Sequence, residues 1–164
     1  MTTLEYLNTC GREEFVALVG PVFEGPPWIA ASAVDRRPFG SREQLYQALC
    51  DIVKTASDEQ QLALVRAHPD LVGRAVLTAE SQREQAAAGL DDLTPADVAA
   101  FDRYNTAYKA RFGFPFVICA RRNRKEAILR GFPERLSHDR ETELATALDQ
   151  IFQIAVLRLR DLLP

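Results

Sequence analysis

The stretch SREQLYQALCDIVKTAS, residues 41–57, carries the pattern that decides the fold. Its apolar residues recur three and four positions apart, which is the spacing that lines one face of an α-helix. These residues are Leu45, Ala48, Leu49, Ile52, Val53 and Ala56. Ser41 can cap the helix, and Gln44 follows it at the distance of a capping box. The stretch therefore predicts an amphipathic helix.

Comparable patterns predict helices along most of the chain. Ser57 and Gln60 form a second capping-box pair before another apolar run. The helix that they start should end at His68, because the residue before a proline is disfavoured in the α region. Thr94 precedes a further helix pattern that should stop at Gly113.

The C-terminal segment predicts the longest helix, from about Asp139 to Leu163. Its inward stripe consists of Leu144, Leu148, Ile151, Ala155, Leu159 and Leu162. The strand-like run FPFVICA, residues 114–120, has no second strand to pair with, so it is interpreted as an extended connector or a short helix. The sequence thus predicts an all-α, single-domain multi-helix bundle of roughly seven to nine helices over residues 1–164.

Composition and charge argue against several kinds of partner. The formal net charge is −3, and basic residues gather only in ARRNRK, residues 120–125, which is interpreted as a solvated loop. No nucleic-acid partner is therefore expected. No apolar run approaches the ~20 residues that span a bilayer, so no membrane association is expected either. The first residues lack the pattern of a secretory signal, and the expected location is the cytoplasm.

The cysteines give no sign of a disulfide framework or a zinc site. Cys10, Cys50 and Cys119 are isolated from one another in the sequence and odd in number. The sequence also contains no nucleotide-binding glycine pattern, HExxH, GxSxG or EF-hand loop. We therefore expect no bound metal.

His68 is the first candidate for chemistry, within LVRAHPDLVG at residues 64–73. Carbonyl groups at a helix C-terminus favour protonation of a nearby imidazole by up to ~2 kcal/mol. Such a ring can exchange a proton near neutral pH, although a simple helix cap is an alternative explanation. The other histidine, His138, is interpreted as a surface residue beside the cap residue Asp139.

The segment TAESQREQAAAGL, residues 78–90, has two interpretations. Ser81 and Glu84 fit a capping box before a short helix that ends at Gly89, and both side chains would then serve the backbone. Alternatively, Glu84 and Gln85 point into a cleft, where they supply a charge and an amide for recognition. The local pattern by itself favours the capping box.

Two further features suggest a polar ligand without requiring one. RFGFPFVICAR, residues 111–121, predicts a buried irregular backbone whose polar groups need partners, either from packing or from a small molecule. Arg158 lies near the apolar face of the last helix, whereas Arg160 lies away from it. A guanidinium in that place needs an anionic ligand or an acidic partner, and Glu84 is one possible partner.

Taken together, these segments resemble the OHCU decarboxylases, the 2-oxo-4-hydroxy-4-carboxy-5-ureidoimidazoline decarboxylases of urate breakdown. The matching segments are AHPDL at 67–71, SQREQAAAGL at 81–90, FDRYNTAYKARFGFPFVICAR at 101–121 and IAVLRLRDLL at 154–163. PWIA at 27–30 and RPF at 37–39 fit as well, so the resemblance covers nearly the whole chain.

The resemblance implies an all-helical, cofactor-free enzyme, commonly a homodimer, whose partner is the small-molecule substrate. It would remove CO2 from OHCU to give (S)-allantoin, after urate oxidase and hydroxyisourate hydrolase have acted. The catalytic histidine of the family falls on His68. The other family site positions fall on Pro69, Ser81, Glu84, Gln85, Phe116, Val117, Ile118 and Arg158.

The resemblance also suggests a role for each of these groups. His68 is expected to act as general acid/base, with Glu84 orienting it or completing a proton relay. Arg158 would recognise the anion, and Gln85 would recognise a ureido or ring amide. Pro69 would direct the imidazole out of the helix toward the cleft.

Two alternatives remain open at this point. A hydrolase of a related ureide would release ammonia or a ring-opened product and no CO2. A non-enzymatic helical interaction module would expose a large apolar stripe, and it would not need His68 and Arg158 to converge.

Overall fold

The computed structural model describes residues 1–73 and 77–164, and within them it contains nine α-helices, three short 3-10 helices and no strand. The prediction of an all-α fold is therefore confirmed. The chain divides into two compact units, Met1–Ala67 with Phe152–Pro164 and His68–Ile151. The expectation of a single domain stays a prediction.

The first unit is built from short helices. Its elements are α1 (Leu4–Thr9), α2 (Arg12–Val19), η1 (Gly20–Val22), α3 (Trp28–Ala33), η2 (Val34–Arg36), α4 (Arg42–Lys54), α5 (Asp58–Arg66) and the C-terminal part of α9 (Arg140–Leu162). α4 packs against α3 and completely buries Leu45, Leu49 and Val53. The apolar spacing of this stretch therefore predicts its buried face correctly.

Side-chain caps begin the helices of this unit much as the sequence predicts. Ser57 accepts a hydrogen bond from Gln60 N–H, and the reciprocal bond of the capping box is present at the start of α5. Ser41 likewise caps α4, but the Gln44 side chain accepts its bond from Gly40 N–H at 2.7 Å. The second half of that predicted capping box is therefore shifted by one residue.

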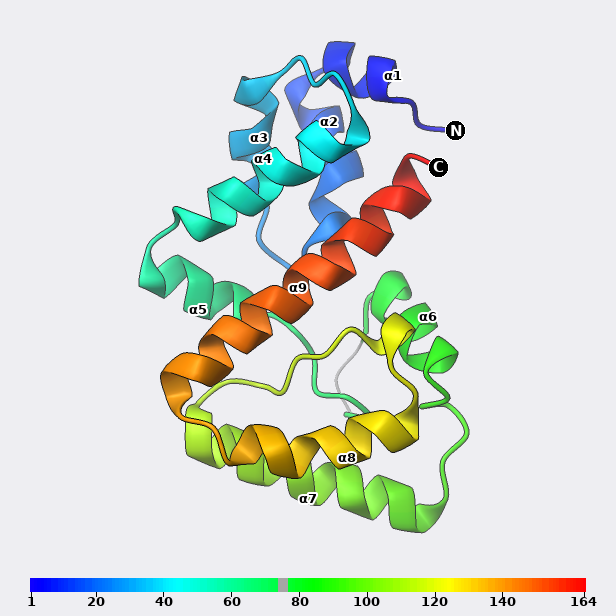
Figure 1. Ribbon diagram of the computed structural model, residues 1–164. Helices are drawn as coiled ribbons and strands as arrows, with labels where there is room; N and C mark the ends of the chain where they lie inside the picture. Colours follow the sequence, from blue (N-terminus) through cyan, green and yellow to red (C-terminus); the bar gives the residue numbers. More distant parts are fainter. Residues whose placement is uncertain (74–76) are drawn as a thin grey trace. The chain divides into compact units, whose positions relative to one another are not determined.

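The second unit contains longer helices and one extended connector. Its helices are α6 (Ala79–Ala87), α7 (Pro95–Phe112), η3 (Ala120–Arg122), α8 (Lys125–Leu136) and the N-terminal part of α9. α7 and α8 lie side by side, and the connector between Phe112 and η3 has no regular structure (Figure 1). The interpretation of this run as an extended connector is confirmed.

Aromatic rings fill the core between α7, α8 and the connector. Phe116 of the connector stacks on Phe132 of α8, with ring centroids 3.9 Å apart. It also meets the edge of Tyr108 from α7 at 5.3 Å between centroids. α7 ends at Gly113, whose φ of 78° is the left-handed conformation that glycine adopts at least cost. The ring contacts fix the path of the connector.

The predicted stripe of α9 needs one correction. Leu144 and Leu148 are only half-buried, whereas Glu143 and Ala147 are completely buried. The buried face therefore starts one position earlier than the apolar pattern indicates, because Glu143 finds polar partners inside the core. Among the helices of residues 1–73 and 77–164, none is both long and apolar enough to cross a membrane.

Candidate active site

His68 lies directly after the C-cap of α5. The helix ends at Arg66 with Ala67 as its cap residue, two residues before the predicted end at His68. Pro69 explains the earlier end, because proline disfavours helical backbone at the residue before it and has no N–H to continue the helix. The His68 side chain is buried, with 8% of its surface exposed. The sequence therefore places a buried titratable ring at the first residue of the second unit.

Three side chains fasten the backbone that follows His68. Lys109 Nζ lies 2.6 Å from the Asp70 carboxylate, and Asn105 Nδ2 donates to the Leu71 carbonyl at 2.8 Å. Val72 N–H donates to Gln85 Oε1 at 3.1 Å. These contacts tie residues 70–72 to α7 and α6.

Val72 has an unusual backbone conformation for a branched residue. Its φ is 57°, which is the left-handed region that β-branched residues rarely adopt. Such a conformation persists only where the surroundings hold it, and it is more frequent at functional sites. The bond from Val72 N–H to Gln85 provides part of that support.

The start of α6 corrects one prediction. Thr78 is the N-cap residue, and its side chain accepts a hydrogen bond from Ser81 N–H at 3.1 Å. Ser81 and Glu84 therefore do not form a capping box but lie inside the helix. With Thr78 as the cap residue, Ser81 and Glu84 lie on the buried face of α6. As predicted, Gly89 follows the helix with a positive φ of 82°.

The buried face of α6 is polar. Ser81, Glu84 and Gln85 lie on the same side of the helix, because residues three and four positions apart face the same way. They are 5%, 9% and 9% exposed, respectively. Burying polar groups costs free energy unless they find partners, so such a face is a poor way to stabilise a helix. This face is the first component of the candidate site.

The extended connector supplies the second component. Phe116 and Val117 are buried and Ile118 is half-buried. The Val117 carbonyl accepts a hydrogen bond from Arg135, and Cys119 N–H donates to Gln150 Oε1 at 2.9 Å. Among the described residues, none accepts a hydrogen bond from Val117 N–H or Ile118 N–H. Two backbone donors therefore remain that a ligand could satisfy.

The two components lie close together. η3, which follows the connector, packs against α6, and Lys125 N–H donates to the Ala88 carbonyl at 3.0 Å. Burial raises the pKa of the Cys119 thiol, whereas a hydrogen bond from the backbone of Arg122 lowers it. The packing of η3 against α6 brings the end of the connector close to α6.

Arg158 belongs to the first unit, where it is buried with 6% of its surface exposed. Its Nη2 lies 2.9 Å from the Glu24 carboxylate, and its Nη1 donates to the Pro21 carbonyl at 3.0 Å. The prediction that Arg158 faces inward is confirmed, as is the exposed position of Arg160. The convergence of Arg158 with His68, and its pairing with Glu84, stay predictions.

Sequence reasoning missed several buried polar residues. Glu24 is the acidic partner of Arg158, and its place in the apolar run VFEG was a signal of burial. Glu143 shares a helix face with Ala147 and Ile151, which was a comparable signal. Arg135 gave no local signal, because α8 is otherwise rich in exposed charges.

His138 also differs from its interpretation as a surface residue. Its ring is half-buried, and Nδ1 lies 2.9 Å from Glu143 Oε2. Asp139 is the cap that the sequence predicts, because its carboxylate accepts a hydrogen bond from Thr142 N–H at 2.7 Å. Among residues 1–73 and 77–164, no group of three or more His, Cys, Asp or Glu side chains is placed to hold a metal ion.

The protein is therefore an all-helical protein with a candidate site for a small polar ligand. The site combines a buried acid, amide and hydroxyl on α6 with two backbone N–H groups of the connector. The family model of the OHCU decarboxylases matches residues 8–160. The chain therefore belongs to the OHCU decarboxylase family.

Individual relatives agree with this assignment. The 2-oxo-4-hydroxy-4-carboxy-5-ureidoimidazoline decarboxylase of Halalkalicoccus jeotgali is 43% identical over 160 residues, covering 98% of this chain and 91% of the relative. The protein of the same name from Haloferax volcanii is 42% identical over 159 residues, covering 97% of this chain and 95% of the relative.

Two solved structures have the same fold. The crystal structure of (S)-allantoin synthase matches with a TM-score of 0.81 at 28% identity, covering 99% of this chain. This chain spans about half the length of that protein, 54% of it. The crystal structure of OHCU decarboxylase in the presence of (S)-allantoin matches with a TM-score of 0.74 at 22% identity, covering 93% of this chain and 98% of that one.

Proposed function

We propose that this chain decarboxylates 2-oxo-4-hydroxy-4-carboxy-5-ureidoimidazoline (OHCU) to (S)-allantoin and CO2. Membership of the OHCU decarboxylase family supports the reaction. The observation that carries the location of the site is the buried polar face of α6, a helix that packs against η3 at the end of the connector. The same face carries the Ser, Glu and Gln positions to which the family resemblance assigns substrate contacts.

The substrate supplies its own electron sink, so the proposed reaction uses no cofactor. OHCU carries a carboxylate and a hydroxyl on C4, next to an imine at C5. When the bond from C4 to the carboxylate carbon breaks, its electron pair forms a C4–C5 double bond and the imine nitrogen takes up a proton. A proton then adds to C5 while the C4 hydroxyl loses its own, which gives the C4 carbonyl of allantoin. The protein's part is to bind, to orient and to move protons.

His68 is proposed to be the general acid/base at the C4 hydroxyl or at C5, and Glu84 to orient it or to complete the proton relay. Both side chains are buried, which strengthens the electrostatic interaction between charged and polar groups. Pro69 fixes the direction in which the backbone leaves His68. A stereospecific product requires that the proton reach only one face of C5, and a ring on fixed backbone suits that requirement.

Recognition of the substrate is divided among several groups. Gln85 has already accepted a hydrogen bond at Oε1, so its remaining function is to donate from Nε2 to a carbonyl of the ureido group or ring. Ser81 offers a hydroxyl from the same face. Val117 and Ile118 offer N–H groups, and Phe116 forms the apolar wall between them and the core.

Arg158 is proposed to bind the substrate carboxylate. Its buried guanidinium is already held by Glu24 and by the Pro21 carbonyl, so the substrate carboxylate would be a further partner. Arg158→Ala should therefore raise KM strongly, whereas Arg160→Ala, which removes an exposed arginine from the same helix, should not. Similar KM values for the two variants would argue against this role.

We also propose that the enzyme is a cytoplasmic homodimer, as the family resemblance implies. Light scattering on the purified chain tests the dimer, because a mass equal to that of a single chain would contradict it. The rival interpretation as a helical interaction module has little support from the exposed surface. In the described residues, the large apolar side chains that are exposed are Met1, Tyr6 and Val98, and these do not make a stripe along any one helix.

A coupled assay tests the proposed function. Urate oxidase and hydroxyisourate hydrolase would generate OHCU in place, and circular dichroism would follow the formation of optically active allantoin. The parent chain should accelerate the formation of (S)-allantoin. His68→Asn should lower that rate by ~10²-fold or more with the fold intact. Racemic allantoin formed at the uncatalysed rate would refute the function. Ammonia or a ring-opened product without CO2 would indicate a hydrolase instead.

A further inference from the structure

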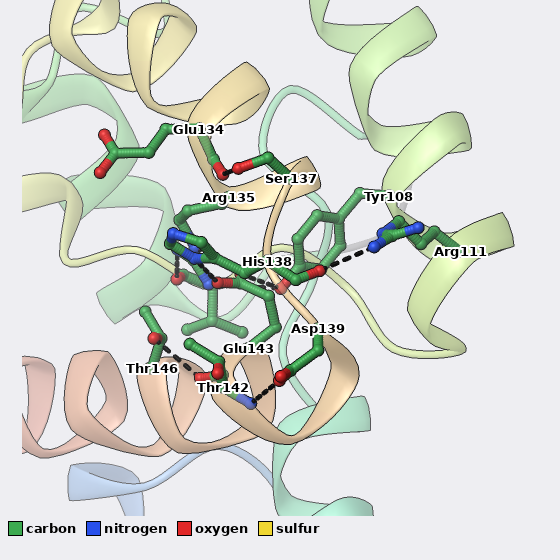
Figure 2. Close-up of polar contacts among 11 residues, drawn as sticks. Tyr108, Arg111, Glu134, Arg135, Ser137, His138, Asp139, Thr142, Glu143 and Thr146 are labelled. Carbon is green, nitrogen blue, oxygen red and sulfur yellow. Dashed lines mark hydrogen bonds and ion pairs between the residues drawn. The ribbon is translucent and has the colours of Figure 1, made fainter.

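A network of polar side chains, most of them buried, joins Tyr108 of α7, Arg135 of α8 and Glu143 of α9 (Figure 2). Glu143 is completely buried and accepts hydrogen bonds from Tyr108 at 2.6 Å and from Arg135 Nε at 2.7 Å. His138 Nδ1 lies 2.9 Å from the second carboxylate oxygen. Because an ionised carboxylate only accepts hydrogen bonds, the His138 ring contributes the proton in that contact.

Arg135 connects this network to the connector. Its Nη1 donates to the Val117 carbonyl at 2.6 Å, and its guanidinium carbon lies 4.1 Å from the centroid of the Phe116 ring. Arg135 therefore contacts two successive residues of the connector with one planar group. A guanidinium combines stacking with several fixed donors, and a lysine ammonium cannot replace both contacts.

The bond to Val117 has a geometric consequence for the next residue. The Val117 C=O and the Ile118 N–H belong to the same peptide group, which is planar and trans, so they point in opposite directions. Arg135 holds the carbonyl on the side of the network, and the Ile118 N–H is therefore directed away from it. No described residue accepts a hydrogen bond from that N–H.

Glu143 allows Arg135 to be buried where it can donate to the Val117 carbonyl. A buried guanidinium without a negative partner is strongly destabilising. Burial raises the pKa of Tyr108, and its hydrogen bond to Glu143 acts in the same direction, so the phenol stays protonated and donates to the carboxylate. The carboxylate is thus fixed from three sides, and it fixes Arg135 in turn.

We propose that Arg135, held by Glu143, is a positioning residue that orients the Val117–Ile118 peptide so that the Ile118 N–H donates to an oxygen of the substrate. This inference rests on the proposed decarboxylase function. Arg135 itself does not touch the substrate, and its effect passes through one peptide group. The consequence is that substrate binding weakens when Arg135 changes, although the groups that move protons remain in place.

Arg135→Lys tests this, with Arg140→Lys as its matched control. Arg140 also donates to a backbone carbonyl, that of Phe112 at 3.1 Å, and lies over a phenylalanine ring, but it is exposed. In the coupled assay, Arg135→Lys should raise KM by about tenfold, the weight of one good hydrogen bond, while kcat changes by less than about twofold. Arg140→Lys should leave both constants near those of the parent.

The outcomes separate the two proposals. An inactive parent chain would refute the decarboxylase function itself. An active parent with a KM rise below about threefold in folded Arg135→Lys would overturn the positioning role alone. If circular dichroism finds Arg135→Lys unfolded, Tyr108→Phe decides instead, because it removes the hydrogen bond to Glu143 and the longer contact from Arg135 Nη2 at 3.4 Å while it keeps the guanidinium. A KM rise of about threefold then supports the role, and an unchanged KM overturns it.

A spectroscopic measurement provides a readout that a purely stabilising role would not give. The amide resonance of Ile118 should move in Arg135→Lys and stay in place in Arg140→Lys, because only the first substitution releases the Val117 carbonyl. An Ile118 resonance that is the same in both folded variants would overturn the inference, whatever the activity.

Discussion

α4 and α6 bury opposite kinds of side chain. α4 buries Leu45, Leu49 and Val53 completely, as a helix that stabilises a core should. α6 places Ser81, Glu84 and Gln85 on its buried face. Each apolar side chain in α4 gains free energy by leaving water, whereas each polar side chain in α6 loses hydration and must recover it from a partner.

Burial therefore has a different meaning in the two helices. In α4 the buried face explains why the unit folds. In α6 the buried face consists of the polar residues that the proposed function assigns to the substrate. The contrast leads to the expectation that substitutions in α4 change stability, and that substitutions on the buried face of α6 change activity.

Leu49→Ala should give the largest effect, on stability. Leu49 has no exposed surface, so its truncation leaves a cavity and should lower the free energy of unfolding by about 2–5 kcal/mol. The folded fraction should keep the kcat of the parent. Urea unfolding, with activity corrected for the folded fraction, measures both quantities. A lower kcat per folded molecule would break the contrast between the helices.

Glu84→Gln should give the converse result. The substitution keeps the shape and removes the charge, so kcat should fall by about 10²-fold while the unfolding midpoint changes little. Glu80→Gln is the matched control, because Glu80 lies on the same helix outside the buried face and pairs only loosely with Arg83. Equal losses of activity in the two variants would show that charge on α6 matters in general, and not the position of Glu84.

Gln85→Glu sharpens the comparison within α6. Glutamate keeps an oxygen for Val72 N–H but loses the Nε2 donor and adds a negative charge near an anionic substrate. KM should rise by about tenfold without loss of the fold. The same change at Gln82, which is exposed on the same helix outside its buried face, should leave KM unaltered. An unchanged KM would mean that Gln85 serves only the backbone of Val72.

The smallest expected effect is the pH dependence of stability that arises from two carboxylates at helix N-termini. A backbone hydrogen bond from Thr94 holds the pKa of Asp97 below its ordinary value of 3.8, and the backbone N–H of Thr142 does the same for Asp139. A lowered folded-state pKa stabilises the protein above the unfolded-state value and ceases to do so as the pH falls through the folded-state value. Stability should therefore decline below about pH 4.

Asp97→Asn removes one of these two titrations. Its stability should depend less steeply on pH in that acid range than the stability of the parent, and the two curves should run parallel above it. Unfolding curves recorded at several pH values measure this. Identical pH dependence in both proteins would contradict the assigned role of Asp97.

The sequence predicts those features of the fold that depend on neighbouring residues. The α5 capping box and the end of α7 at Gly113 both follow from local hydrogen bonding, and both are found. The predicted start of α6 is wrong, because Thr78 and Ser81 are both good cap residues and only packing decides which one is used.

The candidate site could be predicted only in part, for a similar reason. Family resemblance names His68, Glu84 and Gln85 in advance, and all three are buried. Arg135 and Glu143 could not be found from local pattern, because their partners lie on other segments of the chain. Long-range pairing of this kind depends on the path of the whole chain, and helical periodicity carries no information about it.

Titration of the chain with (S)-allantoin, followed by nitrogen–proton correlation spectra, determines whether α6 and the connector bind the ligand. The resonances that move should gather at residues 81–85 and 116–118, with Ile118 among them, while those of Leu45, Leu49 and Val53 stay in place. Resonances that move along α4, or a buried face of α6 that is unaffected up to the solubility limit of the ligand, would contradict the proposed site.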